Sequence, residues 1–325
     1  MAILIRGQEY ANLEEAQSYS RIFHREKSFF NHLVSSNATA EFTLEPRRYH
    51  LYLGYGDPWS HRVLISYVLL ELQEYLSVTM LDPTPAKYGW VFSTRNGCAL
   101  DRVNGCDYLY QIYKLSEPEF TGNVSVPVLW DCKTSQIVNN ESLEIMRLLN
   151  TVFQKVSSSD VQLYPDNLAD EIERYNEFVF ENINNGVYKV GLAPTQKIYS
   201  DNLEALFSAL NELDEQLSHS RYLLGESLTE PDIKLFTSLI RFDTIYHPYM
   251  RCNRQRLQDY VHLWPYTKDI YSIPEIKKTV YFDYIMQTYY GQTYLNPMKI
   301  IPELPDINFE DEIEIFQYDF YSAPF

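Results

Sequence analysis

A carboxylate at the start of a helix is the first feature of this chain that could do chemistry. Residues 54–62 read Gly-Tyr-Gly-Asp-Pro-Trp-Ser-His-Arg, between an alternating apolar run at 49–53 and an apolar helical pattern at 63–70. This order predicts a strand, a glycine-rich turn and a helix. Asp57 occupies the N-cap position and Pro58 the first helical position, where a missing N–H costs nothing. The helix start therefore directs its amides and its positive dipole end toward whatever lies over the turn.

Alternating strand and helix patterns surround this turn and must position it. Strand patterns fall at 48–52, 77–81, 126–130 and 137–138, and helical patterns at 59–75 and 141–153. Strand, helix and strand followed by a hairpin and a helix are typical of the thioredoxin-like fold. After a break at 157–165 only helical patterns follow, at 166–184, 200–217, 231–246, 254–260, 264–272 and 274–289. Residues 229–232, Thr-Glu-Pro-Asp, have the form of a capping box. We therefore predict an α/β thioredoxin-like domain followed by an all-α domain.

The expected domain boundaries leave two further segments. We expect an N-terminal extension at 1–45, the thioredoxin-like domain at 46–156 with an insertion at 83–123, the all-α domain at 165–302 and a tail at 303–325. The extension is polar and irregular, apart from apolar clusters at Ile22-Phe23 and Phe29-Phe30, and should wrap the first domain. The last 25 residues contain seven acids and no Lys or Arg, interleaved with aromatic residues. We expect this tail to pack along the chain's own surface or a partner subunit.

The composition excludes several classes of function. Twenty-seven basic and 44 acidic residues give a net charge of −17, and such a surface repels nucleic acids and anionic lipids. Apolar runs stay below the roughly 18–20 residues of a membrane span, and the N-terminus is charged too early for a signal peptide. We therefore expect a cytoplasmic protein. The four cysteines form no CxxC motif and have no histidines at metal-ligand spacing, so neither a disulfide nor a metal is expected. Residues 54–56 are too short for a phosphate loop, so no nucleotide is expected either.

Residues 57–62 resemble a known signature, the Cys-Pro-Trp-Ala-His-Arg of the glutathionyl-hydroquinone reductases, which are the Xi-class glutathione transferases. The similarity extends from about Phe23 to Pro302 and includes Val-Pro-Val-Leu-Trp-Asp at 126–131 and Val-Asn-Asn-Glu-Ser at 138–142. It implies a thioredoxin-like domain, a helical glutathione-transferase domain and glutathione as the cofactor. In this resemblance Asp57 stands where the family carries its catalytic cysteine.

The resemblance implies a glutathione site in the first domain. Trp90 corresponds to the family's tryptophan beside the glutathione sulfur. Val126 and Pro127, expected in a cis-proline turn, would present backbone groups to the cysteinyl part like an added strand. Glu141 and Ser142 open a helix whose amides and hydroxyl suit a carboxylate, while the Glu141 carboxylate suits an ammonium. Taken alone, the Asn-Glu-Ser sequence could equally be a helix cap.

The resemblance also implies a pocket for a flat aromatic substrate. The residues assigned to it are Tyr188, Tyr289, Tyr290, Arg241, Tyr246, Tyr55 and Trp59. Among these, Tyr188 together with Tyr289 or Tyr290 corresponds to the tyrosines that roof the hydroquinone in the family. Two further departures from the family are the Gly-Asn at 122–123 in place of Gly-Arg, and the Asp-Pro at 82–83 in place of His-Pro.

Asp57 changes the chemistry that the resemblance implies. The family reaction attacks the sulfur of a glutathionylated hydroquinone with a thiolate and passes through a mixed disulfide. A carboxylate forms no disulfide, so we expect this reaction to be absent. Three roles remain for Asp57: an N-cap alone, a general acid or base supported by His61, or an activator of the glutathione thiol. The third role is disfavoured because an ionised carboxylate repels a thiolate.

Three functions follow from these parts. The first is an enzyme on a glutathione-transferase scaffold that isomerises, cyclises or eliminates from an aromatic or quinone-like small molecule. Its acid–base groups would be Asp57, Tyr188, Tyr289 and Tyr290. The second keeps glutathione as a co-substrate, in conjugation or carbon–sulfur cleavage. The third is a non-catalytic binding protein that uses the tail as its contact. A homodimer is expected by analogy with the family alone.

Overall fold

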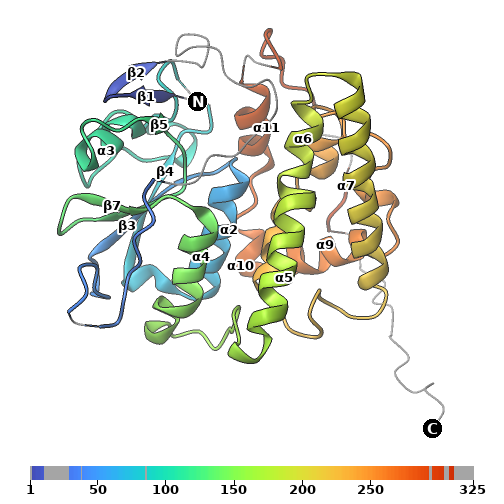
Figure 1. The fold of residues 1–325 in the computed structure, drawn as a ribbon, viewed down its shortest axis with the longest axis horizontal. Helices are drawn as coiled ribbons and strands as arrows, with labels where there is room; N and C mark the ends of the chain where they lie inside the picture. The colour runs from blue at the N-terminus through green and yellow to red at the C-terminus, as the bar shows by residue number, and fades with distance from the viewer. Residues whose placement is uncertain are drawn as a thin grey trace. The chain divides into compact units, whose positions relative to one another are not determined.

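The computed structural model divides the chain into two compact units, residues 1–164 with 278–303 and residues 165–277 with 304–325. The structure describes residues 2–10, 29–37, 39–84, 86–292, 295–303 and 307–310 (Figure 1). The expected cluster at Ile22-Phe23 and most of the expected tail, 311–325, lie outside these residues. Residues 278–302 were expected in the all-α domain, but they belong to the first unit.

A four-stranded sheet forms the centre of the first unit. Its order is β4 (Leu76–Leu81), β3 (Tyr49–Gly54), β6 (Val128–Asp131) and β7 (Gln136–Asn139). β3 pairs parallel with β4 and antiparallel with β6, and β7 continues antiparallel. Helices α2 (Pro58–Leu69) and α4 (Ser142–Thr151) lie side by side on one face (Figure 1). This mixed sheet with its helices is the predicted thioredoxin-like arrangement.

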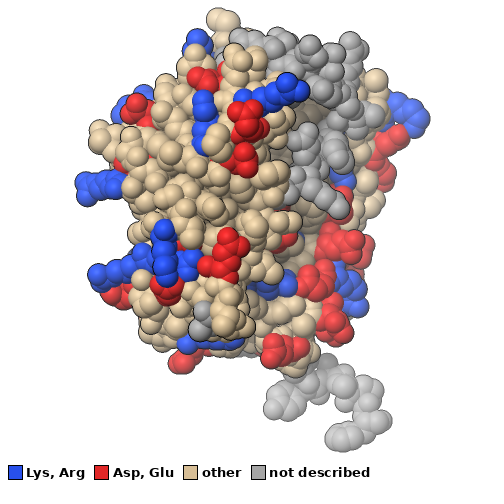
Figure 2. All heavy atoms as spheres, turned by 60° about the vertical axis from the view of Figure 1, so that its left-hand side comes forward, with Lys and Arg blue, Asp and Glu red and all other residues tan. Residues whose placement is uncertain are grey.

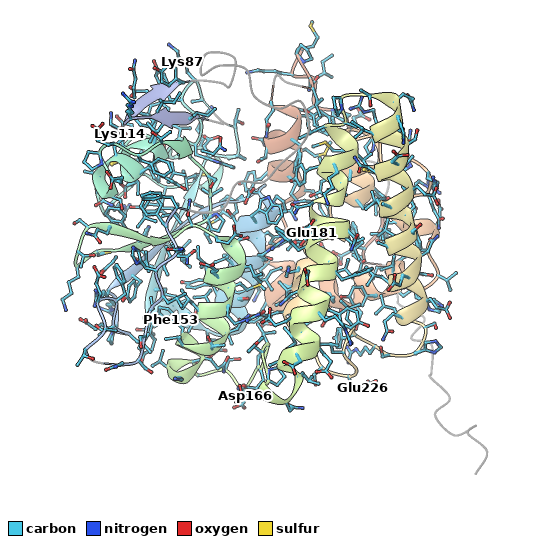
Figure 3. All side chains as sticks on the ribbon, in the orientation of Figure 1. Lys87, Lys114, Phe153, Asp166, Glu181 and Glu226 are labelled. Atoms are coloured by element: carbon cyan, nitrogen blue, oxygen red, sulfur yellow. The ribbon has the colours of Figure 1, made fainter. Side chains whose placement is uncertain are left out.

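A second, smaller sheet corrects the prediction that residues 1–45 are irregular. β1 (Ile3–Ile5) lies between β2 (Gln8–Tyr10) and β5 (Gly122–Asn123), with Ile3 opposite Asn123. The neighbouring helix α3 (Leu109–Ser116) carries Lys114, whose Nζ lies 3.7 Å from a Glu9 carboxylate oxygen (Figure 3). Strands of two or three residues carry too little periodicity to be seen in the sequence, and β1 depends on a partner far along the chain.

Aromatic side chains fill the space between the two sheets. The buried cluster contains Phe30, Tyr52, Trp90, Tyr113, Phe120 and Trp130. The Phe30 ring stacks on that of Phe120 with centroids 5.4 Å apart. The segment that carries Phe30 extends the sheet at β7, because Asn31 forms an antiparallel bridge with Asn139 and the His32 amide donates to the Val138 carbonyl. At least this part of the expected N-terminal extension therefore packs on the first domain.

The second unit is helical. Its α-helices are α5 (Ala169–Val179), α6 (Gly186–Gly191), α7 (Gln196–Gln216), α8 (Glu230–Leu239), α9 (Leu263–Ser272) and α10 (Pro274–Lys277). Every residue of α8 is buried. The predicted capping box is confirmed: the Asp232 carboxylate accepts from the Thr229 amide at 2.9 Å, and Tyr266 Oη donates to it at 2.9 Å.

Some predicted helix boundaries were wrong. The single helix expected at 274–289 consists of α10 and of α11 (Phe282–Tyr290), which belongs to the first unit. Residues 186–191 form α6, where no helix was predicted. The helix was missed because two glycines lower the helical propensity of this stretch. At 254–260 a helix was predicted, and a 3-10 turn at Leu257–Asp259 is found instead.

Figure 2 shows Lys and Arg interspersed with Asp and Glu among wide areas of other residues.

Of the helices in the described ranges, none is both long and apolar enough to cross a bilayer. Within those ranges, no three His, Cys, Asp or Glu residues gather in a way that could hold a metal ion.

Candidate functional site

The glycine turn joins β3 to α2 as the sequence predicts. Asp57 is the N-cap of α2, with an extended backbone (φ −80°, ψ 125°), and its Oδ2 accepts a hydrogen bond from the Ser60 amide at 2.6 Å. The Ser60 hydroxyl in turn accepts from the Gly54 amide at 3.1 Å. The end of the strand, the turn and the start of the helix are thus fastened by two side chains.

Two glycines of the turn are required by what packs against them. A Cβ at Gly54 would lie 2.8 Å from the Trp90 indole, so the predicted site residue Trp90 packs directly on the end of β3. A Cβ at Gly56 would collide with the Thr288 hydroxyl and approach the Tyr284 carbonyl oxygen to 2.5 Å. Helix α11 therefore covers the turn next to Asp57, and the Thr288 hydroxyl donates to the Pro83 carbonyl at 3.0 Å.

A cluster of three tyrosines lies beside the turn. The Tyr55 ring centroid is 4.7 Å from that of Tyr281 and 5.0 Å from that of Tyr284, and the latter two rings stack at 5.3 Å. Burial, with smaller contributions from Tyr281 and Cys98, raises the pKa of Tyr55 to about 12. Tyr55, which we predicted to contact substrate, is therefore a neutral phenol at physiological pH.

The residues after Asp57 are buried along α2. His61 Nε2 is 2.8 Å from the Thr279 hydroxyl, so this nitrogen is occupied by a neighbour other than Asp57. The guanidinium of Arg62 stacks over the Trp59 ring at 4.5 Å from its centroid. Trp59 is 7 % exposed, so this predicted pocket residue is largely buried.

The second predicted part of the glutathione site is the cis-proline turn and the start of α4. The Val126–Pro127 peptide bond is cis, as predicted. Glu141 is the N-cap of α4, and its own amide donates to Asn139 Oδ1 at 2.8 Å. The buried Ser142 hydroxyl lies 3.3 Å from the Glu141 carboxylate. A carboxylate, a hydroxyl and the first-turn amides thus meet at one helix start. The carboxylate could accept from the ammonium of a γ-glutamyl group, and the hydroxyl and amides could donate to its carboxylate.

The predicted aromatic pocket draws on both units. Tyr188 and Tyr246 belong to the helical unit, where their rings make an edge contact at 6.1 Å. Arg241 is fully buried in the same unit and donates to the Thr237 carbonyl at 2.8 Å. Tyr289 and Tyr290 lie on α11 in the first unit, both largely buried. Their assembly into one pocket stays a prediction.

The four thiols are poor nucleophiles. Burial, assisted by Asp82, raises the pKa of Cys98 to about 11, and burial with Asp101 raises that of Cys106 to about 11. Burial also raises the pKa of Cys132 and of Cys252. A thiol attacks as its thiolate, so each of these cysteines is largely in its unreactive form at neutral pH.

Sequence reasoning missed residues that support the site from behind. Ser60 links Asp57 to Gly54, Thr288 packs on Gly56, and Tyr113 hydrogen-bonds both Ser125 and Asn140. In the first of these links, the Asp57–Ser60 hydrogen bond could have been predicted from Asp at the N-cap position, but the bond from Gly54 to Ser60 could not. The other two depend on tertiary packing and left no local signal.

Comparison with known proteins agrees with this fold. The family described as "Glutathione S-transferase, N-terminal domain" matches residues 58–152, and "Glutathione S-transferase, C-terminal domain" matches residues 196–269. The glutathionyl-hydroquinone reductase PcpF of Sphingobium chlorophenolicum is 42% identical over 267 residues, 82% of this chain and 85% of that protein.

Two solved structures share the whole architecture. The Xi-class glutathione transferase of Natrialba magadii superposes with a TM-score of 0.90 at 38% identity, covering 96% of this chain and 95% of that one. The glutathione-bound structure of YqjG from Escherichia coli K-12 superposes with a TM-score of 0.86 at 34% identity, covering 96% and 98%. A thioredoxin-like unit with a helical unit defines the class as a glutathione transferase. The chain belongs to this family, in its Xi-class, glutathionyl-hydroquinone reductase-like branch.

Proposed function

We propose that this protein is a glutathione-binding enzyme that does not perform the thiol–disulfide reaction of its reductase relatives at residue 57. The observation that carries the proposal is the Asp57 carboxylate at the N-cap of α2, 2.6 Å from the Ser60 amide. The family resemblance places the nucleophilic thiol at this position, and a carboxylate forms no mixed disulfide. The raised pKa values of Cys98 and Cys106 further support the proposal, because neither thiol is poised to replace the missing one.

In place of thiol chemistry we propose proton transfer on an aromatic or quinone-like small molecule. Asp57 would act as the acid or base, with Tyr188, Tyr289 and Tyr290 as phenol donors in the pocket. Burial raises the pKa of Tyr290, so this phenol is neutral at physiological pH and would act as a hydrogen-bond donor. By analogy with the family we also propose a homodimer in the cytoplasm.

The reductase reaction is tested by restoring the thiol. Wild type, Asp57→Cys and Asp57→Ser are assayed with a glutathionylated hydroquinone. We expect wild type and Asp57→Ser to remain at the uncatalysed rate, and Asp57→Cys to gain activity and to form a mixed disulfide detectable by mass spectrometry. Serine is the matched control because it also caps a helix but cannot form a disulfide. Wild-type activity comparable to that of Asp57→Cys would contradict the proposal.

Glutathione binding is tested separately by calorimetric titration of the wild type. We expect a saturable signal at or below millimolar concentrations of reduced glutathione. The absence of any heat of binding in that range would contradict the proposal that this protein binds glutathione. Loss of glutathione during turnover, measured with a thiol reagent, would favour conjugation over proton transfer.

A further inference from the structure

The hydroxyl of Tyr113 joins two backbone segments that the proposed glutathione site uses. Tyr113 lies on α3 within the insertion, and its side chain is fully buried. Its Oη donates to the Ser125 carbonyl at 2.8 Å. The same oxygen accepts from the Ser125 amide at 3.3 Å and from Asn140 Nδ2 at 3.0 Å.

Each bonded residue directly precedes a predicted glutathione contact. Ser125 is followed by Val126 and Pro127, and Asn140 is followed by Glu141 and Ser142. The two segments belong to different elements, the entry to β6 and the start of α4. One phenol oxygen therefore links two segments of the proposed glutathione site. The first would pair with the cysteinyl part of glutathione, and the second would hold its γ-glutamyl part.

The aromatic packing of Tyr113 keeps this oxygen in place. Its ring makes contacts with Phe30 at 5.7 Å and with Phe120 at 5.2 Å between centroids. The backbone carbonyl of Phe30 also accepts a hydrogen bond from the backbone amide of Asn140 at 3.3 Å. Burial raises the pKa of Tyr113, so the phenol keeps the proton that it donates to Ser125.

We propose that Tyr113 is a positioning residue for glutathione recognition, whose hydroxyl holds the Ser125–Pro127 and Asn140–Ser142 segments at the separation that one tripeptide requires. This inference rests on the proposed function, since it needs glutathione to bind. Tyr113 itself is buried beneath these segments and acts through them. Removing its hydroxyl should therefore weaken binding without removing any group that touches the ligand.

The test compares two Tyr→Phe variants. In Tyr113→Phe we expect the dissociation constant for glutathione to rise about tenfold, the usual order for the loss of hydrogen bonds that fix a binding group. Tyr52→Phe is the matched control: Tyr52 is equally buried in the same unit, and its Oη donates to Asp101 at 2.9 Å and accepts from Asn104 at 3.0 Å. We expect Tyr52→Phe to bind glutathione within twofold of wild type.

Asn140→Ala tests the same link from its other end and does not require the Tyr113 variant to fold. We expect it to weaken binding by a similar factor, and to add little when combined with Tyr113→Phe. Unchanged affinity in Tyr113→Phe, equal losses in both Tyr→Phe variants, or full additivity with Asn140→Ala would overturn the inference. Failure of the wild type to bind glutathione would instead refute the proposed function, and the two failures are thereby distinguished.

Discussion

The carboxylate of Asp57 has a structural task whatever chemistry it also performs. It accepts the Ser60 amide at 2.6 Å, and the Ser60 hydroxyl accepts the Gly54 amide at 3.1 Å. The position of the N-cap could be predicted from Asp followed by Pro, because both residues have strong local preferences. The return link to Gly54 could not, since it depends on how closely the strand end approaches the helix.

The structural and chemical roles of Asp57 are separable by substitution. Asp57→Ala should lower the free energy of unfolding by about 1 kcal/mol because α2 loses its cap. Asp57→Ser and Asp57→Asn should lower it much less, because serine and asparagine also cap helices. Urea denaturation measures this difference. Once a substrate is turned over, Asp57→Asn should lose most activity while remaining as stable as wild type. Full turnover by Asp57→Asn would restrict Asp57 to capping.

At the level of elements, α11 decides how the turn is covered. The sequence predicted a helix near 274–289 but not that its second half would pack on Gly56. Patterns of 3.6 and 2 residues revealed the main strands and helices of both units. They could not reveal β1 or the packing position of α11, because each is stabilised by contacts with residues far along the chain. They also could not reveal β2, because three residues are too few to show a period.

Substitution of Gly56 tests this packing. A methyl group there would meet Thr288 and the Tyr284 carbonyl, so Gly56→Ala should lower the free energy of unfolding by about 3 kcal/mol. Gly105→Ala is the control, because Gly105 has φ +71° with open space around its Cβ position. Its cost should be about 1 kcal/mol, from backbone conformation alone. Chemical denaturation measures both values. An equal loss of stability in the two variants would show that α11 shifts at little cost to make room for the methyl group.

For the whole molecule, charge couples stability to acidity. Arg48 donates to Asp131 through Nη2 at 2.5 Å and to Glu45 at 2.8 Å, which ties the 41–48 segment to β6. Burial alone would raise the pKa of Asp131, but the hydrogen bonds from Arg48 and its neighbours lower it overall. Hydrogen bonds from Thr43 first and then from Lys133 lower the pKa of Glu45 to about 2.

Both acids therefore have a lower pKa in the folded chain than in the unfolded one. The contribution of Glu45 is complete above about pH 4.5, the ordinary pKa of its carboxyl, and is lost as the pH falls toward 2. Thr43→Val should raise the pKa of Glu45, and Glu45→Gln should flatten the fall in stability below pH 4. Carboxyl-carbon NMR titration and urea denaturation at several acidic pH values measure these effects. An unchanged Glu45 titration in Thr43→Val would contradict this assignment.

The membership of residues 278–303 in the first unit has a consequence for biosynthesis. A ribosome makes the chain from its N-terminus, so the segment that packs on Gly56 emerges only after residues 165–277 of the helical unit have been translated. The glycine turn of the nascent first unit therefore stays uncovered until residues 278–303 have been translated. A polypeptide stalled before residue 278 would carry Asp57 without the helix that encloses its turn.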